Sequence, residues 1–324
     1  MLNSPFGYVI DKNIDIVMPY VNNQDKVWRK VFKDYCHAHK EYADKLEMID
    51  GERFRDNHNY FELNLKLIRV CFPFIRKFYL IVSNPEQVEG MDLTGVEVVL
   101  HKDIMPSHIL PTFNSSVIEM FIGNIKGLAD RFIYLNDDMI PLRVLSESDF
   151  YDEQGRAKMT IYTQHETTIN SPFREMVARE YKDVFKGDEQ YLGDDFYLRP
   201  EHTATPMITS VVRESMNLYA DKIMAHTEAF RNVEQFNQYL YIYEMIKRGL
   251  VVPSDLPFIY LKLRQHDFLN KCYMICHKDG SRYGMMCFND DLEDNVLGDA
   301  ELRHRVLRRT LELCLQYLTE KKDI

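Results

Sequence analysis

Short apolar runs alternate with amphipathic stretches along the first half of the chain. The runs are rich in Val, Ile, Leu and aromatic residues, which is typical of strands that are covered on both faces. They lie at 14–21, 77–83, 96–100 and 131–135. Amphipathic helices are predicted at 26–40, 56–71 and 117–126. This alternation predicts an α/β fold with a Rossmann-like, mostly parallel sheet and helices on both of its faces.

The second half of the chain has a less regular pattern. Dense charge and scattered aromatic residues at 149–199 predict an insertion or lid with some helix. Helices are predicted at 206–220 and 233–248, and a strongly amphipathic helix at 300–322. We expect the last helix to pack on the domain, with a dimer or membrane-surface contact as the alternative. No internal repeat is visible, and the length suits one large domain over 1–324, or a core domain with a sizeable insertion.

Composition narrows the class of protein. The 324 residues carry a formal net charge of −10, which argues against a general nucleic-acid binder. The six cysteines lack the spacing of a disulfide scaffold, and no signal peptide or apolar run of ~20 residues is present, so we expect a cytoplasmic protein with reduced thiols. A zinc cluster from Cys272, Cys276, His277 and Cys287 is an alternative use of the thiols.

Polar residues end the most distinctive apolar run. Asn136, Asp137 and Asp138 follow the strand predicted at 131–135. Ligands bind at the carboxyl ends of strands in open α/β sheets, and paired carboxylates suit a hard divalent cation beside phosphates. An ordinary polar turn is the alternative reading.

Four blocks of residues together carry a resemblance to a known family. They are Ile14–Asp25 followed by Trp28; Arg53-Phe-Arg-Asp-Asn57 through 73–77 and 110–119 to Tyr134-Leu-Asn-Asp-Asp138; His202 with Pro206, followed by Phe230-Arg231; and Cys287-Phe-Asn-Asp290. In this order and approximate spacing, the chain resembles the Stealth family over residues 14 to 320. That family includes bacterial capsular polysaccharide phosphotransferases and the catalytic part of animal GlcNAc-1-phosphotransferase.

The resemblance implies an activity and its partners. The expected reaction moves a hexose-1-phosphate, such as GlcNAc-1-phosphate, from a UDP-sugar-type donor to a hydroxyl of a glycan or oligosaccharide acceptor. It forms a phosphodiester and releases a nucleoside monophosphate. Mg²⁺ or Mn²⁺ is the expected cofactor, and the sheet is expected to be glycosyltransferase-A-like. Because bacterial relatives build cell-surface glycans, we expect a cytoplasmic location with peripheral contact at the inner membrane face.

The resemblance also marks individual residues of this chain. The expected catalytic residues are Glu119, Asp138, His202 and Arg231. The expected substrate-binding residues are Asp56, Asn57, Arg53, Arg55, Asn114, Asn136 and Asn22. The expected metal ligands are Asp137, Asp138, Asn289 and Asp290. Their chemistry suits the reaction, because a guanidinium fork binds phosphate, imidazole accepts a proton from a hydroxyl, and a metal on a carboxylate neutralises a diphosphate.

Simpler interpretations of the same residues stay open. Ser116-x-x-Glu119 matches a capping box, and Asp56 with Asn57 could cap a helix. His202 and Arg231 could be surface groups, and Asn289-Asp290-Asp291 an acidic turn. At the level of function, the alternatives are a metal-dependent glycosyltransferase that releases a nucleoside diphosphate, a phosphodiester hydrolase, and a non-catalytic glycan-binding protein.

Overall fold

A five-stranded sheet forms the centre of the computed structural model, which describes residues 2–3, 9–10, 12–50, 60–188, 190–191, 195–276, 281–289 and 297–321. In spatial order, the strands are β11 (Thr205–Ile208), β6 (Arg131–Tyr134), β3 (Ile14–Pro19), β4 (Lys77–Val82) and β5 (Val96–Leu100). β6, β3, β4 and β5 are parallel, while β11 runs antiparallel along β6. The predicted mostly parallel sheet is confirmed.

The strand order creates a switch point beside β3. From β3, the chain adds β4 and then β5 on one side, and afterwards returns to place β6 on the other side. At such a point the connections leave the sheet in opposite directions, so a crevice opens beyond the carboxyl ends of the two strands. The carboxyl ends of β3 and β6 are therefore the expected ligand-binding edge.

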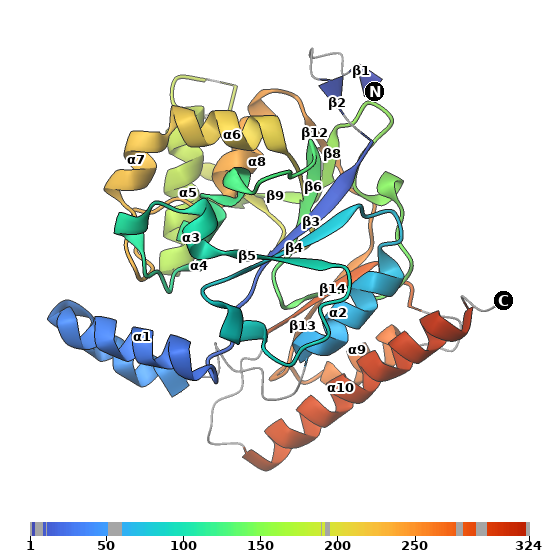
Figure 1. Ribbon diagram of the computed structural model, residues 1–324. Coiled ribbons are helices and arrows are strands. Elements are labelled where there is room, and N and C mark those ends of the chain that lie inside the picture. The colour runs from blue at the N-terminus through green and yellow to red at the C-terminus, as the bar shows by residue number, and fades with distance from the viewer. Residues whose placement is uncertain are drawn as a thin grey trace.

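Helices cover both faces of this sheet (Figure 1). On one side of the central strands lie α2 (Tyr60–Cys71), α9 (Phe268–Ile275) and α10 (Leu297–Glu320). On the other side lie α5 (Pro172–Phe185), α6 (Thr209–Leu218) and α8 (Tyr239–Lys247). The fully buried strand residues, such as Ile16, Leu80 and Ile133, are thus covered from both directions, as their continuous apolar runs predict.

Smaller elements complete the described chain. The remaining helices are α1 (Lys26–Ala38), α3 (His101–Ile104), α4 (Ser115–Glu119) and α7 (Ala220–Ala225), with a 3-10 helix at Lys40–Asp50 after α1. The remaining strands are β1 (Leu2–Asn3), β2 (Val9–Ile10), β7 (Met139–Pro141), β8 (Ala157–Met159), β9 (Ile161–His165), β10 (Phe196–Pro200), β12 (Val251–Pro253), β13 (Phe258–Lys262) and β14 (Met285–Asn289). Among the described helices, none has the length and apolar character that a membrane span requires.

The structure corrects two of the predicted helices. Residues 206–208 belong to β11, because Pro206 and Met207 are buried against Ile133 and Phe132 of the neighbouring strand; helix α6 begins only at Thr209. The helix predicted from 233 begins at Tyr239. Before it, the side chain of Asn232 accepts hydrogen bonds from the backbone N–H groups of Glu234 and Gln235, and this local turn competes with a helix.

Two further helices also have boundaries that differ from the prediction. The helix predicted at 117–126 is the short α4, which ends at Glu119, and the C-terminal helix begins at Leu297 and ends at Glu320. Helix α5, from the segment predicted as an insertion or lid, buries Met176, Val177 and Tyr181 in the same hydrophobic core as the sheet. Whether 149–199 acts as a lid stays a prediction.

Candidate active site

The turn that follows β6 is held in one conformation from several directions. The hydroxyl of Tyr134 donates to Asn136 Oδ1 at 2.7 Å, and the backbone N–H of Met139 closes the turn onto the carbonyl of Asn136 at 3.1 Å. From α2, the buried Asn64 donates to the carbonyls of Asp137 and Met139, both at 3.0 Å. The carboxylates of Asp137 and Asp138 therefore project from a rigid turn at the ligand-binding edge of the sheet.

Strand register brings His202 to Asp138. Because β11 runs antiparallel to β6 with Thr205 opposite Tyr134, the residues before Thr205 lie beside the turn that follows β6. Nε2 of His202 lies 3.4 Å from Oδ2 of Asp138, and the backbone N–H of His202 donates to the Glu201 carboxylate at 3.0 Å. Both the His202 and Asp138 side chains are about one-third exposed, at 34% and 33%, so the pair is open to a ligand.

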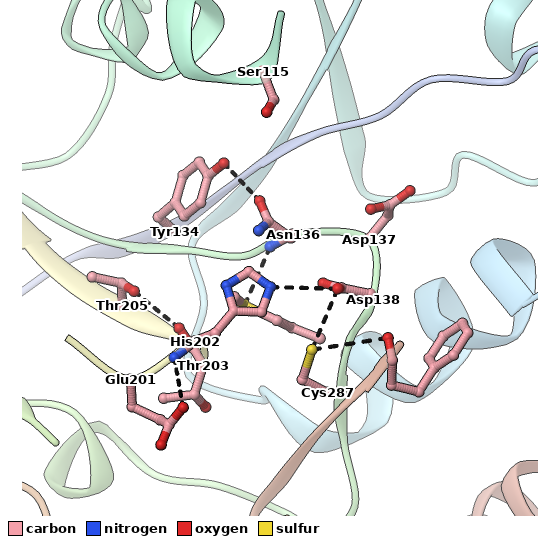
Figure 2. A network of polar contacts seen from close by, with 12 residues as sticks. Ser115, Tyr134, Asn136, Asp137, Asp138, Glu201, His202, Thr203, Thr205 and Cys287 are labelled. Carbon is pink, nitrogen blue, oxygen red and sulfur yellow. Dashed lines mark hydrogen bonds and ion pairs between the residues drawn. The ribbon is translucent and has the colours of Figure 1, made fainter. Parts of the chain in front are cut away.

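Cys287 reaches the same carboxylate from a third segment. Strand β14 pairs with β7, with Cys287 opposite Met139, and the thiol donates to Oδ2 of Asp138 at 3.3 Å. Figure 2 shows the imidazole, from the loop before β11, and the sulfur, from β14, converging on this carboxylate. The other oxygen of Asp138, Oδ1, is buried and has no hydrogen-bond partner in the described part of the chain. We call Asp138, His202 and Cys287 the strand half of the site.

Charge in the strand half shifts two pKa values in the same direction. Burial alone lowers the pKa of His202, but the charge and hydrogen bond of Asp138 outweigh burial, so the net pKa is raised. Burial raises the pKa of the Cys287 thiol well above its usual range, and the nearby Asp138 charge raises it further. The thiol is therefore protonated and acts as a donor to Asp138.

Glu119, at the end of α4, is almost fully buried, at 6% exposure. Its Oε1 accepts from the Tyr134 hydroxyl at 3.0 Å, and its Oε2 accepts from the backbone N–H of Gln238 at 3.1 Å. The capping-box interpretation of Glu119 is wrong, because Asn114 caps α4 by accepting from Ser116 N. Tyr134 bonds both Glu119 and Asn136, so it links Glu119 to the Asp-bearing turn.

Arg231 approaches from the loop before α8. Its guanidinium donates to the hydroxyl of Ser115 in α4, one helical turn before Glu119. The neighbouring Phe230 stacks on Phe113, which precedes α4, with ring centroids 5.3 Å apart, and so fixes the base of the Arg231 loop. The Arg231 side chain itself is exposed and available to a ligand. We call Glu119 and Arg231 the helix half of the site.

The two halves share one electrostatic environment. Burial raises the pKa of Glu119, while the Gln238 N–H, the Arg231 charge and, to a smaller extent, Tyr134 and His202 work in the opposite direction. Hydrogen bonds join these residues to one another's surroundings: Tyr134 links Glu119 to the turn that carries Asp138, and Ser115 links Arg231 to α4. The four residues expected to be catalytic thus meet at one edge of the sheet, although they come from four distant segments.

The other expected site residues have diverse placements. Asn136 lies half-buried in the turn, and Asp137 and Asn289 are exposed at strand ends. Asn22 follows β3, where its backbone exchanges hydrogen bonds with Gln87. Asn114 is fully buried and its side chain bonds Glu228, Gln235 and Ser116, so its contacts are internal. Outside the described residues lie Arg53, Arg55, Asp56, Asn57 and Asp290. The roles of all these residues in binding stay predictions.

Sequence reasoning did not foresee two members of the network. The sequence offered Cys287 as a metal ligand in a zinc cluster with Cys272, Cys276 and His277, the last of which lies outside the described residues. Within the described ranges, the group of donor atoms able to hold a metal is Asp138, His202 and Cys287, whose ligand atoms lie within 4.8 Å of one another. Tyr134 opens the family block that ends at Asp138, but nothing in the sequence assigned a role to its hydroxyl. The position of Cys287 three residues before Asp290, in a block of the family pattern, was the available clue.

The donor set fits a divalent cation. The unpartnered buried oxygen of Asp138 is a ready ligand, and the exposed carboxylate of Asp137 is its neighbour in the same turn. Carboxylate oxygens suit both Mg²⁺ and Mn²⁺, the two expected ions.

Comparison with known proteins bears directly on these residues. The model of Stealth protein conserved region 2 matches residues 53–159, which include Glu119 and Asp138. The capsular polysaccharide phosphotransferase LcbA of Neisseria meningitidis is 26% identical over 296 residues, covering 88% of this chain and 80% of that protein. The exopolysaccharide phosphotransferase cps2G of Lactiplantibacillus plantarum is 34% identical over 149 residues, covering 45% of this chain and 41% of that protein. The chain is thus similar to Stealth proteins in this region and to a capsular polysaccharide phosphotransferase over most of its length. The resemblance expected from the sequence is confirmed.

Solved structures with a similar fold include a sugar-transferring enzyme. The galactosyltransferase LgtC, crystallised with donor and acceptor sugar analogues, has a TM-score of 0.40 and 12% sequence identity. The match covers 90% of this chain and 95% of LgtC.

Proposed function

We propose that this protein transfers a sugar-1-phosphate from a nucleotide-sugar to a hydroxyl group of a glycan and releases a nucleoside monophosphate. The observation that carries the proposal is the convergence of Glu119, Asp138, His202 and Arg231 at the carboxyl edge of β6. The relatives named as capsular and exopolysaccharide phosphotransferases supply the class of reaction.

The proposed reaction breaks and forms one bond at phosphorus. The acceptor oxygen attacks the phosphorus that bears the sugar and forms a new P–O ester bond. The P–O bond of the pyrophosphate breaks, and its electron pair leaves with the nucleoside monophosphate. His202 takes the proton of the acceptor hydroxyl, and its contact with Asp138 orients the imidazole and stabilises the imidazolium that results.

The other residues manage charge on the phosphates. The exposed fork of Arg231, held by Ser115, binds a non-bridging phosphate oxygen pair. The buried Glu119 favours the positive charge of the Arg231 guanidinium and of the imidazolium that forms when His202 accepts the proton. Asp138 and Asp137 would hold a divalent cation, Mn²⁺ or Mg²⁺, which would supply further neutralisation of the diphosphate.

Finer features of the reaction extend this proposal. We propose a UDP-sugar such as UDP-GlcNAc as the donor, a capsule or other cell-surface glycan as the acceptor, and a cytoplasmic site of action with peripheral membrane contact. The named relatives act on capsular polysaccharide or exopolysaccharide, which supports the class of acceptor.

Product analysis tests the proposed reaction. The protein is incubated with a panel of nucleotide-sugars, glycan acceptors and Mn²⁺ or Mg²⁺, and both the nucleotide and the glycan are identified by mass. We expect a nucleoside monophosphate together with a glycan enlarged by a sugar phosphate. Nucleoside diphosphate with a glycan enlarged by the sugar alone would establish a glycosyltransferase instead. Monophosphate without glycan growth would establish a hydrolase.

A matched pair of histidine variants tests the site. His202→Gln removes the proposed proton acceptor, whereas His108→Gln changes an exposed histidine outside the site. We expect product formation to fall about 100-fold in the first variant and to be unchanged in the second. Equal rates for wild type and His202→Gln would remove His202 from the mechanism.

A further inference from the structure

Two buried carboxylates from different helices meet the N-terminal end of α8. Glu119 of α4 accepts from the N–H of Gln238, as described above. Glu180 of α5 accepts from the N–H groups of Asn237, at 3.1 Å, and Leu240, at 2.9 Å, through its Oε1 atom. The backbone at the start of α8 thus donates N–H groups to two different acidic side chains. The partial positive charge of a helix N-terminus favours this arrangement.

Glu180 belongs to a larger clamp on the segment that leads into α8. Its neighbour Arg179 donates to the backbone carbonyls of Val233 and Gln235 and lies 4.7 Å from the centre of the Phe236 ring. Adjacent residues of α5 therefore hold the carbonyl groups before the helix and the N–H groups at its start. This segment begins just after Arg231 and contains Gln238, so it connects the residues of the helix half.

The hydrogen bonds of the Glu180 side chain are concentrated on the start of α8. It is fully buried, and its Oε2 atom has no hydrogen-bond partner in the described part of the chain. Burial raises the pKa of Glu180 well above its usual range, and the nearby charge of Glu119 adds to this effect, while the N–H of Asn237 works against it. Burying a carboxyl group so deeply destabilises the fold unless hydrogen bonds compensate for the lost contact with water.

We propose that Glu180 is a positioning residue for Glu119. Its carboxyl group holds the N–H groups of Asn237 and Leu240 and so fixes the backbone between these two residues. This backbone presents the N–H of Gln238 to Glu119. The inference rests on the proposed function and assigns a catalytic purpose to α5, the helix of the segment predicted as an insertion or lid. Glu180 itself contacts neither half of the site; it acts through the backbone of α8.

Three variants separate positioning from general stability. Glu180→Ala removes the acceptor, and Glu180→Gln keeps an Oε1 acceptor of the same shape without the acid. Glu244→Ala is the matched control, because Glu244 is also a buried glutamate of this region, in α8 itself, but bonds Tyr219 instead of the start of the helix. All are compared by thermal unfolding and by initial rates of nucleotide release.

We expect Glu180→Ala to lower kcat about 10-fold or more while changing the KM for the donor less than about 2-fold. We expect Glu180→Gln to restore most of the rate, and Glu244→Ala to retain the wild-type kcat even where its melting temperature falls as far. A Glu180→Ala protein with wild-type kcat, or a Glu244→Ala protein with an equal loss of kcat, would overturn the proposal.

A double-variant cycle tests whether Glu180 acts through Glu119. In the Glu119→Gln background, the further change Glu180→Ala should lower the residual rate less than about 2-fold, because the carboxylate that it positions is already absent. An undiminished 10-fold loss in that background would show that Glu180 acts by another route.

Hydrogen exchange tests the placement without depending on the reaction. The amides of 237–240 should exchange at least about 10-fold faster in Glu180→Ala than in wild type and Glu180→Gln. Unchanged exchange would overturn the proposal. If wild-type protein releases no nucleoside monophosphate from any donor, the proposed function fails separately, and the exchange result still decides whether Glu180 holds this turn.

Discussion

The strand half of the site and the helix half are positioned by different kinds of contact. Asp138, His202 and Cys287 follow or lie on strands, and their meeting is set by the pairing of β11 with β6 and of β14 with β7. Glu119 and Arg231 lie on a five-residue helix and in a loop, and their positions depend on single hydrogen bonds to Tyr134, Gln238 and Ser115. Register places the first group, and side-chain contacts place the second.

This difference has a consequence for sensitivity to change. A sheet edge is held by many backbone hydrogen bonds, so replacing one side chain in the strand half removes that group's chemistry and leaves the frame intact. In the helix half, a replacement at a supporting residue also moves the catalytic group. Substitutions of supporting residues should therefore affect catalysis more in the helix half than in the strand half.

The largest effect is expected from the centre of the strand half. Asp138→Asn keeps the shape of the side chain but removes the charge that faces His202 and the proposed cation. We expect nucleotide release to fall about 1,000-fold with little change in melting temperature. Asp255→Asn, at an exposed aspartate that pairs with Lys158, is the control and should retain the full rate. A rate for Asp138→Asn within 10-fold of wild type would contradict the assignment.

In the helix half, the largest effect is expected from the guanidinium. Arg231→Lys retains the charge but loses the planar fork, so we expect a rate about 100-fold below wild type. Arg156→Lys, whose arginine pairs with Asp152 in a surface turn, should behave as wild type in the same assay. Full activity of Arg231→Lys would mean that only the charge at this position matters.

An intermediate effect on the rate is expected from Tyr134, which links the two halves. Tyr134→Phe removes the hydroxyl that bonds both Glu119 and Asn136, so we expect a rate about 10-fold lower and a free energy of unfolding lower by about 1–2 kcal/mol. Tyr151→Phe also removes a buried hydroxyl, which bonds the backbone of Phe132 and Met207, and should lose stability without losing rate. Equal rates for the two variants would show that the halves work independently.

A smaller effect is expected from the supporting thiol of the strand half. Cys287→Ala removes the donor to Asp138, and we expect a rate about 3-fold lower, whereas Cys287→Ser supplies another donor and should lie within about 2-fold of wild type. The comparison with Glu180→Ala is the sharper test. If Cys287→Ala costs more activity than Glu180→Ala, supporting residues are not more important in the helix half.

The smallest effect on the rate is expected from His101, which belongs to neither half. Burial lowers the pKa of His101 from 6.5 to about 4, so the folded protein resists its protonation. This residue's contribution to stability is complete above pH 6.5 and is lost as the pH falls towards 4, by up to about 3 kcal/mol. His101→Gln should lose that part of the pH dependence in urea unfolding, with an unchanged rate at neutral pH. Parallel pH profiles for both proteins would exclude the effect.

The strand half of the site was easier to predict from the sequence than the helix half. The strands that end at the site were predictable, because buried strands are encoded in short apolar runs, and Asp137 and Asp138 directly follow one of them. The segment 231–238 was predicted to be partly helical, yet Asn232 and Gln235 turn it into an ordered loop through contacts with its own backbone and with Asn114. Apolar periodicity does not reveal such polar contacts.

The sequence by itself determined the α/β class, the edge of the sheet where a ligand binds, and the acidic, imidazole and guanidinium groups that resemble a Stealth site. These features depend on local periodicity and on short blocks of residues. Only the tertiary structure decided that the Cys287 thiol bonds Asp138, that Tyr134 joins the two halves, and that Glu180 supports the turn that bonds Glu119. The physical reason is that these contacts join segments far apart in the chain, and their geometry depends on strand register and loop conformation, which no local pattern specifies.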